Sequence, residues 1–234
     1  MSCYNIAGLT VEFEAVGRTA KQAERYLCPP AEPDIRFRIR PSLVDDYMRA
    51  HPELDRDSAF YLMSGYAFYH KLSAFDGMML HSSALIVDGR AYLFSGQCGI
   101  GKSTHAAYWR ELLGERAVTL NDDKPAIRII EGVPTAFGTP WSGKNDISVN
   151  AGAPVGGICF ISRGSENAIT RLSPALAAAR IIDQSNKAQS EAQWERVLSV
   201  VDRIVASVPV YLLKCINDVS AARLSVRTMT GENV

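Results

Sequence analysis

The stretch from Gly96 to Ser103 constrains this chain more than any other. It reads Gly-Gln-Cys-Gly-Ile-Gly-Lys-Ser and fits G-x-x-x-x-G-K-[ST], the pattern of a phosphate-binding loop. Glycine tolerates positive φ angles, so the backbone can turn its N–H groups toward a phosphate chain. The pattern predicts that Lys102 reaches the outer phosphates and that the Ser103 hydroxyl ligates Mg²⁺. The residues predicted to bind a nucleotide here are Gly96, Gln97, Cys98, Gly99, Ile100, Gly101, Lys102, Ser103 and Thr104.

The segments around this loop have the order that such a loop requires. Residues 91–95 are predicted to form a buried strand, and residues 104–113 a helix whose positive N-terminal end faces the bound anion. Asp88-Gly89 separates the strand at 91–95 from another apolar run at 84–87 and indicates a tight hairpin. The strand entering the loop is therefore expected to pair antiparallel with its predecessor. In Ras-like proteins that entry is parallel.

Composition limits the class of protein. The 234 residues suffice for a substantial core, and 25 Lys and Arg balance 25 Asp and Glu, which gives no general attraction for nucleic acid or an anionic membrane. No apolar run has the roughly 20 residues of a membrane helix, and no signal peptide is recognisable at the N-terminus. The five scattered cysteines show neither metal-ligand spacing nor a disulfide framework. A reduced, cytoplasmic protein is the simplest expectation.

The first 76 residues have a pattern of their own. Residues 9–15 and 35–40 alternate apolar and polar side chains, as half-exposed strands do. Aromatic residues recur at helical spacing over 58–75 and predict a helix packed on a sheet. We expect residues 1–76 to form a small N-terminal α+β subdomain and residues 77–234 to form the nucleotide-binding domain.

The remainder of the chain predicts a mixture of strands and helices. Strands are expected at 117–120, 126–130, 133–137, 155–161 and 208–214, with the second and third joined as a hairpin. Helices are expected to begin after Ser173, with Pro174 at the first position, and after Ser190, where Gln193 completes a capping box. Asp218 is expected to cap a last, short helix.

Asp122 and Asp123 follow the predicted strand at 117–120, about 20 residues after Ser103. A phosphate-binding loop needs an acidic group at the end of a nearby strand to hold the metal ion. One carboxylate is expected to hold Mg²⁺, and the other to accept a proton from an attacking hydroxyl or water. The sequence leaves open which aspartate has which role. An ordinary pair of turn residues is the competing interpretation.

Three further side chains are candidates for the same site. His81 precedes the hairpin and is a candidate catalytic residue, although a lone histidine is often structural. Lys144 lies in a glycine-containing loop and is a candidate second phosphate ligand, with an exposed solvent lysine as the alternative. Arg163 could neutralise charge in the transition state, but a surface ion pair is the simpler interpretation.

The run His81-Ser82-Ser83-Ala84, the Asp88-Gly89 hairpin, the Gly96–Ser103 loop and Asn121-Asp122-Asp123 together resemble the catalytic domain of HPr kinase/phosphorylase. The same residues are similar to the nucleotide site of ATP-dependent phosphoenolpyruvate carboxykinase, whose fold that kinase shares. The resemblance covers about residues 80–215. It implies a mixed α/β fold with a mixed sheet. It also implies phosphate and Mg²⁺ binding by Lys102 and Ser103, and metal binding and base catalysis by the aspartates, with a role for His81.

Two departures from that family bear on the substrate. Those kinases place a glutamate directly after the loop serine, where this chain has Thr104, and their glycine-rich signature is replaced by the loop at 138–146. The sequence therefore predicts an ATP- and Mg²⁺-dependent kinase acting on a hydroxyl of a small molecule or a protein serine, and leaves that acceptor unidentified. The alternative is a nucleotide-binding accessory or regulatory protein without turnover. No nucleic-acid or membrane partner is expected. A homo-oligomer is compatible with the sequence, which does not determine the oligomeric state.

Overall fold

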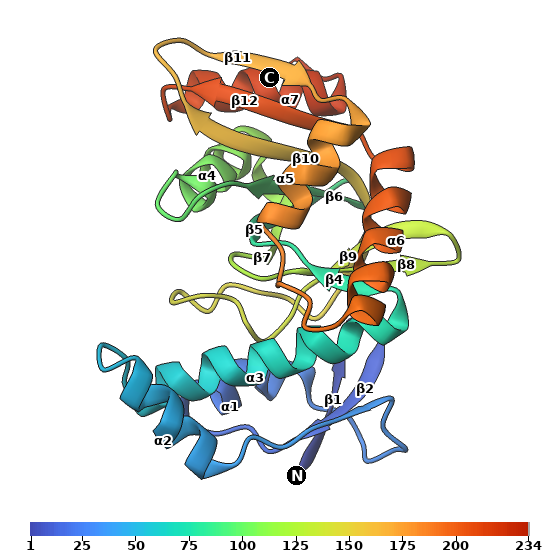
Figure 1. Cartoon of the computed structure of the whole chain (residues 1–234). Helices are drawn as coiled ribbons and strands as arrows, with labels where there is room; N and C mark the ends of the chain where they lie inside the picture. The colour runs from blue at the N-terminus through green and yellow to red at the C-terminus, as the bar shows by residue number, and fades with distance from the viewer. Residues whose placement is uncertain (234) are drawn as a thin grey trace.

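The computed structural model describes residues 1–233. Its N-terminal part is a small sheet with helices packed on it, drawn from blue to turquoise in Figure 1. The elements are β1 (Ser2–Ile6), β2 (Leu9–Phe13), α1 (Gly17–Ala23), β3 (Ile35–Arg36), α2 (Pro41–Ala50) and α3 (Arg56–Leu72). β2 pairs antiparallel with β1 and parallel with β3, and its apolar residues Leu9, Val11 and Phe13 are buried as the alternation predicts.

Two predictions for this part need correction. The strand expected over 35–40 has only two residues, because its partner β2 ends at Phe13 and leaves later residues without a strand to pair with. The helix expected over 58–75 begins at Arg56, where the Asp55 carboxylate accepts a hydrogen bond from Ser58 N, and it ends at Leu72. A 3₁₀ turn follows at Ser73–Phe75, and Asp76 then takes a left-handed conformation.

The large sheet is mixed. Within residues 1–233 it comprises nine strands, seven of them in the order β4-β8-β9-β10-β6-β5-β7, with β12 beside β10 and β11 beside β12. Their bounds are β4 (Gly77–Met79), β5 (Ser82–Val87), β6 (Arg90–Ser95), β7 (Ala117–Asn121), β8 (Ala126–Ile130), β9 (Val133–Phe137), β10 (Gly152–Arg163), β11 (Ala168–Arg171) and β12 (Val210–Cys215). β5 pairs antiparallel with β6, and β8 with β9, as the two hairpin signals predict. The mixed α/β class is confirmed.

β10 joins the two halves of this sheet. Its first residues, 152–154, pair antiparallel with β9, whereas residues from Val155 onward pair parallel with β6, and from Ile158 also with β12. The register shifts between Val155 and Gly157, where the strand changes partners. The strand that enters the loop at Gly96 therefore has an antiparallel neighbour on one side and a parallel one on the other.

Helices cover both faces of the sheet, and successive strand residues alternate between them. α4 (Lys102–Leu113) and α7 (Val219–Thr230) pack on the face that buries Phe94, while α5 (Pro174–Asp183) and α6 (Glu191–Ser207) pack on the face that buries Leu93. The caps at Ser190 and Asp218 form, since Ser190 Oγ accepts from Gln193 N and the Asp218 carboxylate accepts from Ala221 N. The predicted capping box is incomplete, because Gln193 Oε1 accepts from Gln189 N instead of Ser190 N, and the Ser173 side chain makes no capping hydrogen bond. Across residues 1–233, no helix combines the length and apolar character that crossing a membrane would require.

A further apolar cluster connects the N-terminal part to the large sheet. Phe13, Phe68 and Tyr69 from the N-terminal part pack with Trp141, which is fully buried, and with Ala126 of β8. In Figure 1, α3 runs between the small sheet and the large one. This cluster crosses the division expected at residue 76. The division itself remains a prediction.

Candidate functional site

The strand, loop and helix around Gly96–Ser103 occur in the predicted order. β6 ends at Ser95, the loop follows, and α4 begins at Lys102, two residues earlier than expected. Gly96 and Gly101 both have positive φ, at 143° and 107°. A Cβ atom at Gly96 would lie 2.8 Å from Ile161 O, and one at Gly101 would lie 2.6 Å from Asn217 Nδ2. Gly96 therefore requires glycine for conformation and for space, because the close atom is backbone, whereas Gly101 requires it for conformation, since the exposed Asn217 side chain can move.

Lys102 is held inside this loop. Its side chain is buried, and Nζ donates hydrogen bonds to Gly96 O at 3.1 Å and Gln97 O at 3.3 Å. Burial lowers the pKa of the ammonium group, while the nearby Cys98 and the two aspartates oppose that shift. The lysine thus lies along the loop whose backbone N–H groups are expected to bind phosphate.

Asp122 lies next to the first turn of α4. Ser83 Oγ, on β5, is 2.7 Å from Asp122 Oδ1 and 3.3 Å from Ser103 Oγ, so these oxygens form one group. β5 and β7 are hydrogen-bonded neighbours, which brings Ser83 to the end of the strand that Asp122 follows. Hydroxyl and carboxylate oxygens are the hard ligands that Mg²⁺ prefers.

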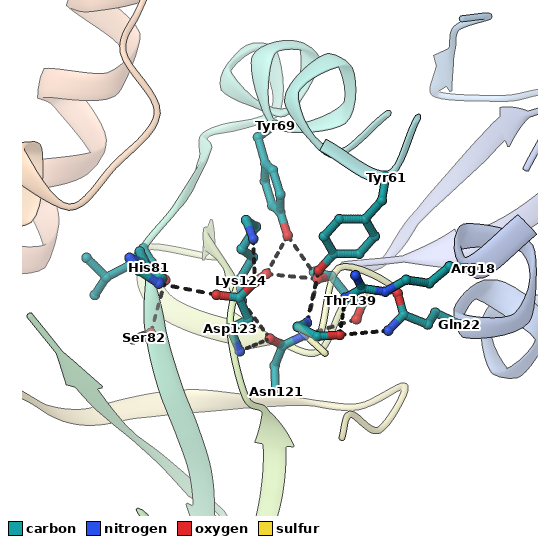
Figure 2. A network of polar contacts seen from close by, with 12 residues as sticks. Arg18, Gln22, Tyr61, Tyr69, His81, Ser82, Asn121, Asp123, Lys124 and Thr139 are labelled. Carbon is teal, nitrogen blue, oxygen red and sulfur yellow. Dashed lines mark hydrogen bonds and ion pairs between the residues drawn. The ribbon is translucent and has the colours of Figure 1, made fainter. Parts of the chain in front are cut away.

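Asp123 lies in a different environment from Asp122. Its Oδ1 is 3.2 Å from His81 Nε2, and its Oδ2 is paired with the Lys124 ammonium. Figure 2 shows the carboxylate between these two side chains. Burial by itself would raise the pKa of Asp123, but the contacts with His81 and Lys124 outweigh it and lower that pKa to about 2.

The buried Asn121 orients both aspartates. Its Oδ1 accepts hydrogen bonds from Asp123 N at 3.0 Å and Lys124 N at 2.8 Å, which forms a tight turn after β7. Its Nδ2 donates to Thr139 O at 3.0 Å. The two carboxylates consequently leave the strand in different directions, one toward Ser103 and the other toward His81.

The loop at 138–146 is tied to the N-terminal part. Gly143 O accepts hydrogen bonds from Arg18 and from Gln22 Nε2, and Gly143 N donates to Tyr61 Oη at 2.9 Å. Figure 2 shows these side chains converging on the loop from α1 and α3. Lys144, the next residue, is exposed. Two helices near the N-terminus thereby fix a loop that lies 82 to 125 residues later in the chain.

A cavity of about 370 Å³ is lined by both aspartates but by only four of the predicted site residues, and neither His81 nor Lys102 lines it. Ser103, Asp122, Asp123 and Lys144 line it together with Lys124. Gly96, Gln97, Cys98, Gly99 and Ile100 line a second cavity of about 480 Å³, to which Arg163 and Arg180 also contribute. Gln97, Cys98 and Thr104 are exposed. Among residues 1–233, no three His, Cys, Asp or Glu side chains form a metal-binding group.

Several polar residues of the site were not predicted. Lys124 and Asn121 flank the acidic pair, and an Asn followed by Asp-Asp at a strand end is a recognisable turn signal. Arg18, Gln22 and Tyr61 gave no such signal, because their partners lie far away in the sequence.

Comparison with known proteins identifies the family. The family model described as ScmC, SynChlorMet cassette protein ScmC, matches residues 55–219, which is more than half of the chain. The chain belongs to the ScmC family. The match begins at the start of α3 and includes the Gly96–Ser103 loop, the acidic pair and the loop at 138–146. No curated protein matches the chain.

One solved structure similar to this ScmC-family protein is the Hpr(Ser) kinase/phosphatase from Coxiella burnetii. The match has 13% sequence identity, covers 65% of this chain and 93% of that one, and has a TM-score of 0.39. With a TM-score below 0.5, this likeness identifies no residue of the chain as functional. The expected kinase resemblance is thus accompanied by a family match that names no kinase.

Proposed function

We propose that this protein is a Mg²⁺-dependent phosphotransferase that transfers the terminal phosphoryl group of ATP to a hydroxyl of a small molecule or a protein serine. The observation that supports it is the placement of two consecutive carboxylates beside the phosphate-binding loop. Asp122 is grouped with Ser83 and Ser103, whereas Asp123 is grouped with His81 and Lys124. A phosphotransferase needs both a metal ligand and a proton acceptor, and these environments suit those two roles.

In this proposal the loop and α4 bind the phosphates of the substrate ATP. The backbone N–H groups of Gly96–Gly101 and the Lys102 ammonium are the donors, and the N-terminal end of α4 adds a favourable dipole. Ser103 and Asp122 supply hard oxygen ligands for Mg²⁺, which would neutralise charge on the phosphates. Lys144 lines the same cavity and is the proposed second phosphate contact.

Asp123 is the proposed proton acceptor for the substrate hydroxyl. His81 holds one of its oxygens and Lys124 the other, so the carboxylate has a fixed orientation. Asn121 fixes the backbone from which the carboxylate projects. His81 is therefore proposed to position Asp123.

The second candidate, a nucleotide-binding accessory protein without turnover, is favoured by one feature of the same group. Both carboxylate oxygens of Asp123 already have partners, and these contacts lower its pKa to about 2, which makes Asp123 a weak proton acceptor. The Thr104 position, where the resembling kinases have glutamate, is consistent with this alternative.

The two candidates differ in the effect of replacing each aspartate by asparagine. Nucleotide affinity is measured by calorimetry with Mg²⁺-ATP, and turnover by ATP hydrolysis and by labelling of a panel of alcohols and serine peptides. Asp122→Asn is expected to weaken Mg²⁺-nucleotide binding. Asp123→Asn is expected to leave binding nearly unchanged and to lower turnover by roughly 10²–10⁴-fold, because the amide is not basic.

Asp202→Asn serves as the matched control, since Asp202 is exposed on α6, outside the cavities at the loop. It is expected to behave like the wild type in both assays. Equal, negligible hydrolysis in the wild type and both site variants, with no acceptor labelled, would overturn the phosphotransferase. Retained nucleotide binding in that case would support the accessory protein.

A further inference from the structure

A third cavity, of about 620 Å³, lies beside the candidate site on the side of the N-terminal part. Its volume is within the range of small-molecule binding pockets. Aromatic side chains from α2, α3 and the loop at 138–146 dominate its wall. The residues that matter here are Tyr47, Tyr61, Met63, Tyr66, Trp141 and Lys124.

This cavity adjoins the one that contains the acidic pair. Tyr61, Leu62 and Lys124 line both of them. Tyr61 stands at the junction: its hydroxyl accepts from Gly143 N, and the Lys124 Nζ lies 5.3 Å from its ring centre. Figure 2 shows Tyr61, Tyr69 and Lys124 around Asp123. A molecule in the third cavity could therefore present a group to Asp123.

Two polar atoms of the buried rings that line the cavity are already bonded within the protein. Trp141 Nε1 donates to Ser64 Oγ at 3.1 Å, and Tyr69 Oη lies 2.9 Å from Thr139 Oγ1. Tyr47 and Tyr66 are the more exposed rings of the wall and offer their faces beside the Met63 thioether, all of which favour an aromatic partner, whereas the fully buried Trp141 lies behind them. The side-chain amides of Asn186 and Gln189 add polar groups to the same lining. Of the described residues lining the cavity, none carries a carboxylate, and Lys124 at the inner end is the one charged side chain.

We propose that this cavity binds an aromatic ring of the phosphoacceptor, so that a hydroxyl elsewhere in the same molecule reaches Asp123. The inference rests on the proposed phosphotransferase function and narrows its substrate class. The ring can belong to a free aromatic alcohol or to a residue next to the serine of a peptide. Both share the same chemistry, and the experiment distinguishes them.

The binding test uses the full chain labelled with fluorotryptophan and followed by fluorine NMR. The added compounds are tryptophol, acetyl-Ser-Trp-amide and, as the control without a ring, acetyl-Ser-Gly-amide. Binding of the ring is expected to move the Trp141 resonance, assigned with Trp141→Phe. Trp109, buried between α4 and the sheet, is the internal control that should not move.

Two variants test whether the ring binds in this cavity. Ala67→Phe adds a ring at a residue that lines the cavity and is expected to weaken binding at least tenfold, whereas Ala74→Phe, at an exposed residue outside it, is not. Tyr66→Ala, which removes a half-exposed ring from the wall, is the second cavity variant and should weaken binding without endangering the fold. Response to tryptophol alone identifies a free alcohol, and response to the peptide alone identifies a peptide. No response to either compound, or an equal response to the glycine peptide, would overturn the inference.

Phosphoryl transfer is measured separately with the same compounds and Mg²⁺-ATP. Transfer is expected to follow the binding preference and to disappear in Asp123→Asn, which should still bind the ring. Ring binding detected through Trp141 without phosphoryl transfer to any of these compounds would contradict the role of the bound molecule as phosphoacceptor. Transfer to acetyl-Ser-Gly-amide as readily as to the tryptophan peptide would contradict the role of the cavity and leave the proposed phosphotransferase function standing.

Discussion

At the level of single residues, the buried side-chain amide of Asn121 determines the directions in which the carboxylates of Asp122 and Asp123 point. Consecutive residues of an extended strand point in opposite directions, but Asp122 and Asp123 follow the strand in a turn closed by Asn121. That turn, with Ser83 and His81 on either side, gives two identical carboxylates different partners. Side chains of the same type therefore acquire separate proposed roles from their surroundings alone.

Gly138 shows how tightly the backbone is packed next to this turn. A Cβ atom there would lie 1.9 Å from Val149 O and 2.8 Å from Leu120 O, and backbone atoms cannot move aside as a flexible side chain can. Gly138→Ala is therefore expected to destabilise the fold by about 3 kcal/mol or more. Urea unfolding followed by circular dichroism measures the change in the free energy of unfolding.

Gly89→Ala is the matched control for that substitution. Gly89 has a φ of 78° in the β5–β6 turn, and a Cβ there would meet nothing within 4 Å. Only the left-handed conformation penalises alanine, by about 1–2 kcal/mol. If Gly138→Ala were no more destabilising than Gly89→Ala, the close backbone approach at Gly138 would be wrong.

At the scale of elements, α4 and α7 are joined by one buried hydroxyl. Ser225 Oγ on α7 lies 2.9 Å from His105 Nε2 and accepts a hydrogen bond from Trp109 Nε1 at 2.8 Å, while it donates to Ala222 O. Because Ser225 donates its hydroxyl hydrogen to Ala222 O, His105 Nε2 and Trp109 Nε1 both act as donors to Ser225 Oγ. The C-terminal helix thereby holds the helix that follows the phosphate-binding loop.

Replacing that hydroxyl tests the joint between the two helices. Ser225→Ala would leave two buried N–H groups without an acceptor, so the free energy of unfolding is expected to fall by about 2–4 kcal/mol. Thr228→Ala removes an exposed hydroxyl from the same helix and should change it by less than about 0.5 kcal/mol. Thermal unfolding of both variants measures the difference, and equal melting temperatures would contradict this account.

At the scale of the whole molecule, Trp141 connects two sheets. Its ring stacks on Phe68 at 4.9 Å and lies 6.1 Å from Phe13, both in the N-terminal part, although its own loop follows β9 of the large sheet. Hydrogen bonds from Arg18 and Gln22 to the same loop reinforce this contact. We therefore expect the small and large sheets to unfold together.

Amide hydrogen exchange of the wild type and of Trp141→Ala measures whether the two sheets unfold together. Removing a fully buried indole is expected to cost about 3–5 kcal/mol, and amides of both β2 and β6 should lose protection by the same amount. Trp194→Ala, a partly exposed position on α6, is the control and should cost less. Loss of protection in β2 alone would show that the sheets unfold separately.

Features with local causes could be predicted from the amino-acid sequence. The Gly96–Ser103 loop between strand and helix, both hairpins and the caps at Ser190 and Asp218 follow from residues that are neighbours in the chain. Glycine conformation, alternation of apolar residues and capping hydrogen bonds act over a few residues, so a pattern suffices to predict them. Short elements such as α1, β4 and β11 carried too few residues to form a pattern.

Contacts between groups far apart in the chain could not be predicted and became clear from the folded structure. The sequence placed Asp122 and Asp123 near the loop but left their roles open, because Ser83 and His81 come from an earlier strand region and pair with them only once β5 and β7 are neighbours. The attachment of the loop at 138–146 to α1 and α3, and the aromatic cavity formed beside it, likewise join residues far apart in the chain. Such contacts depend on how complete elements pack, and a side chain carries no local mark of the partner that packing will bring to it.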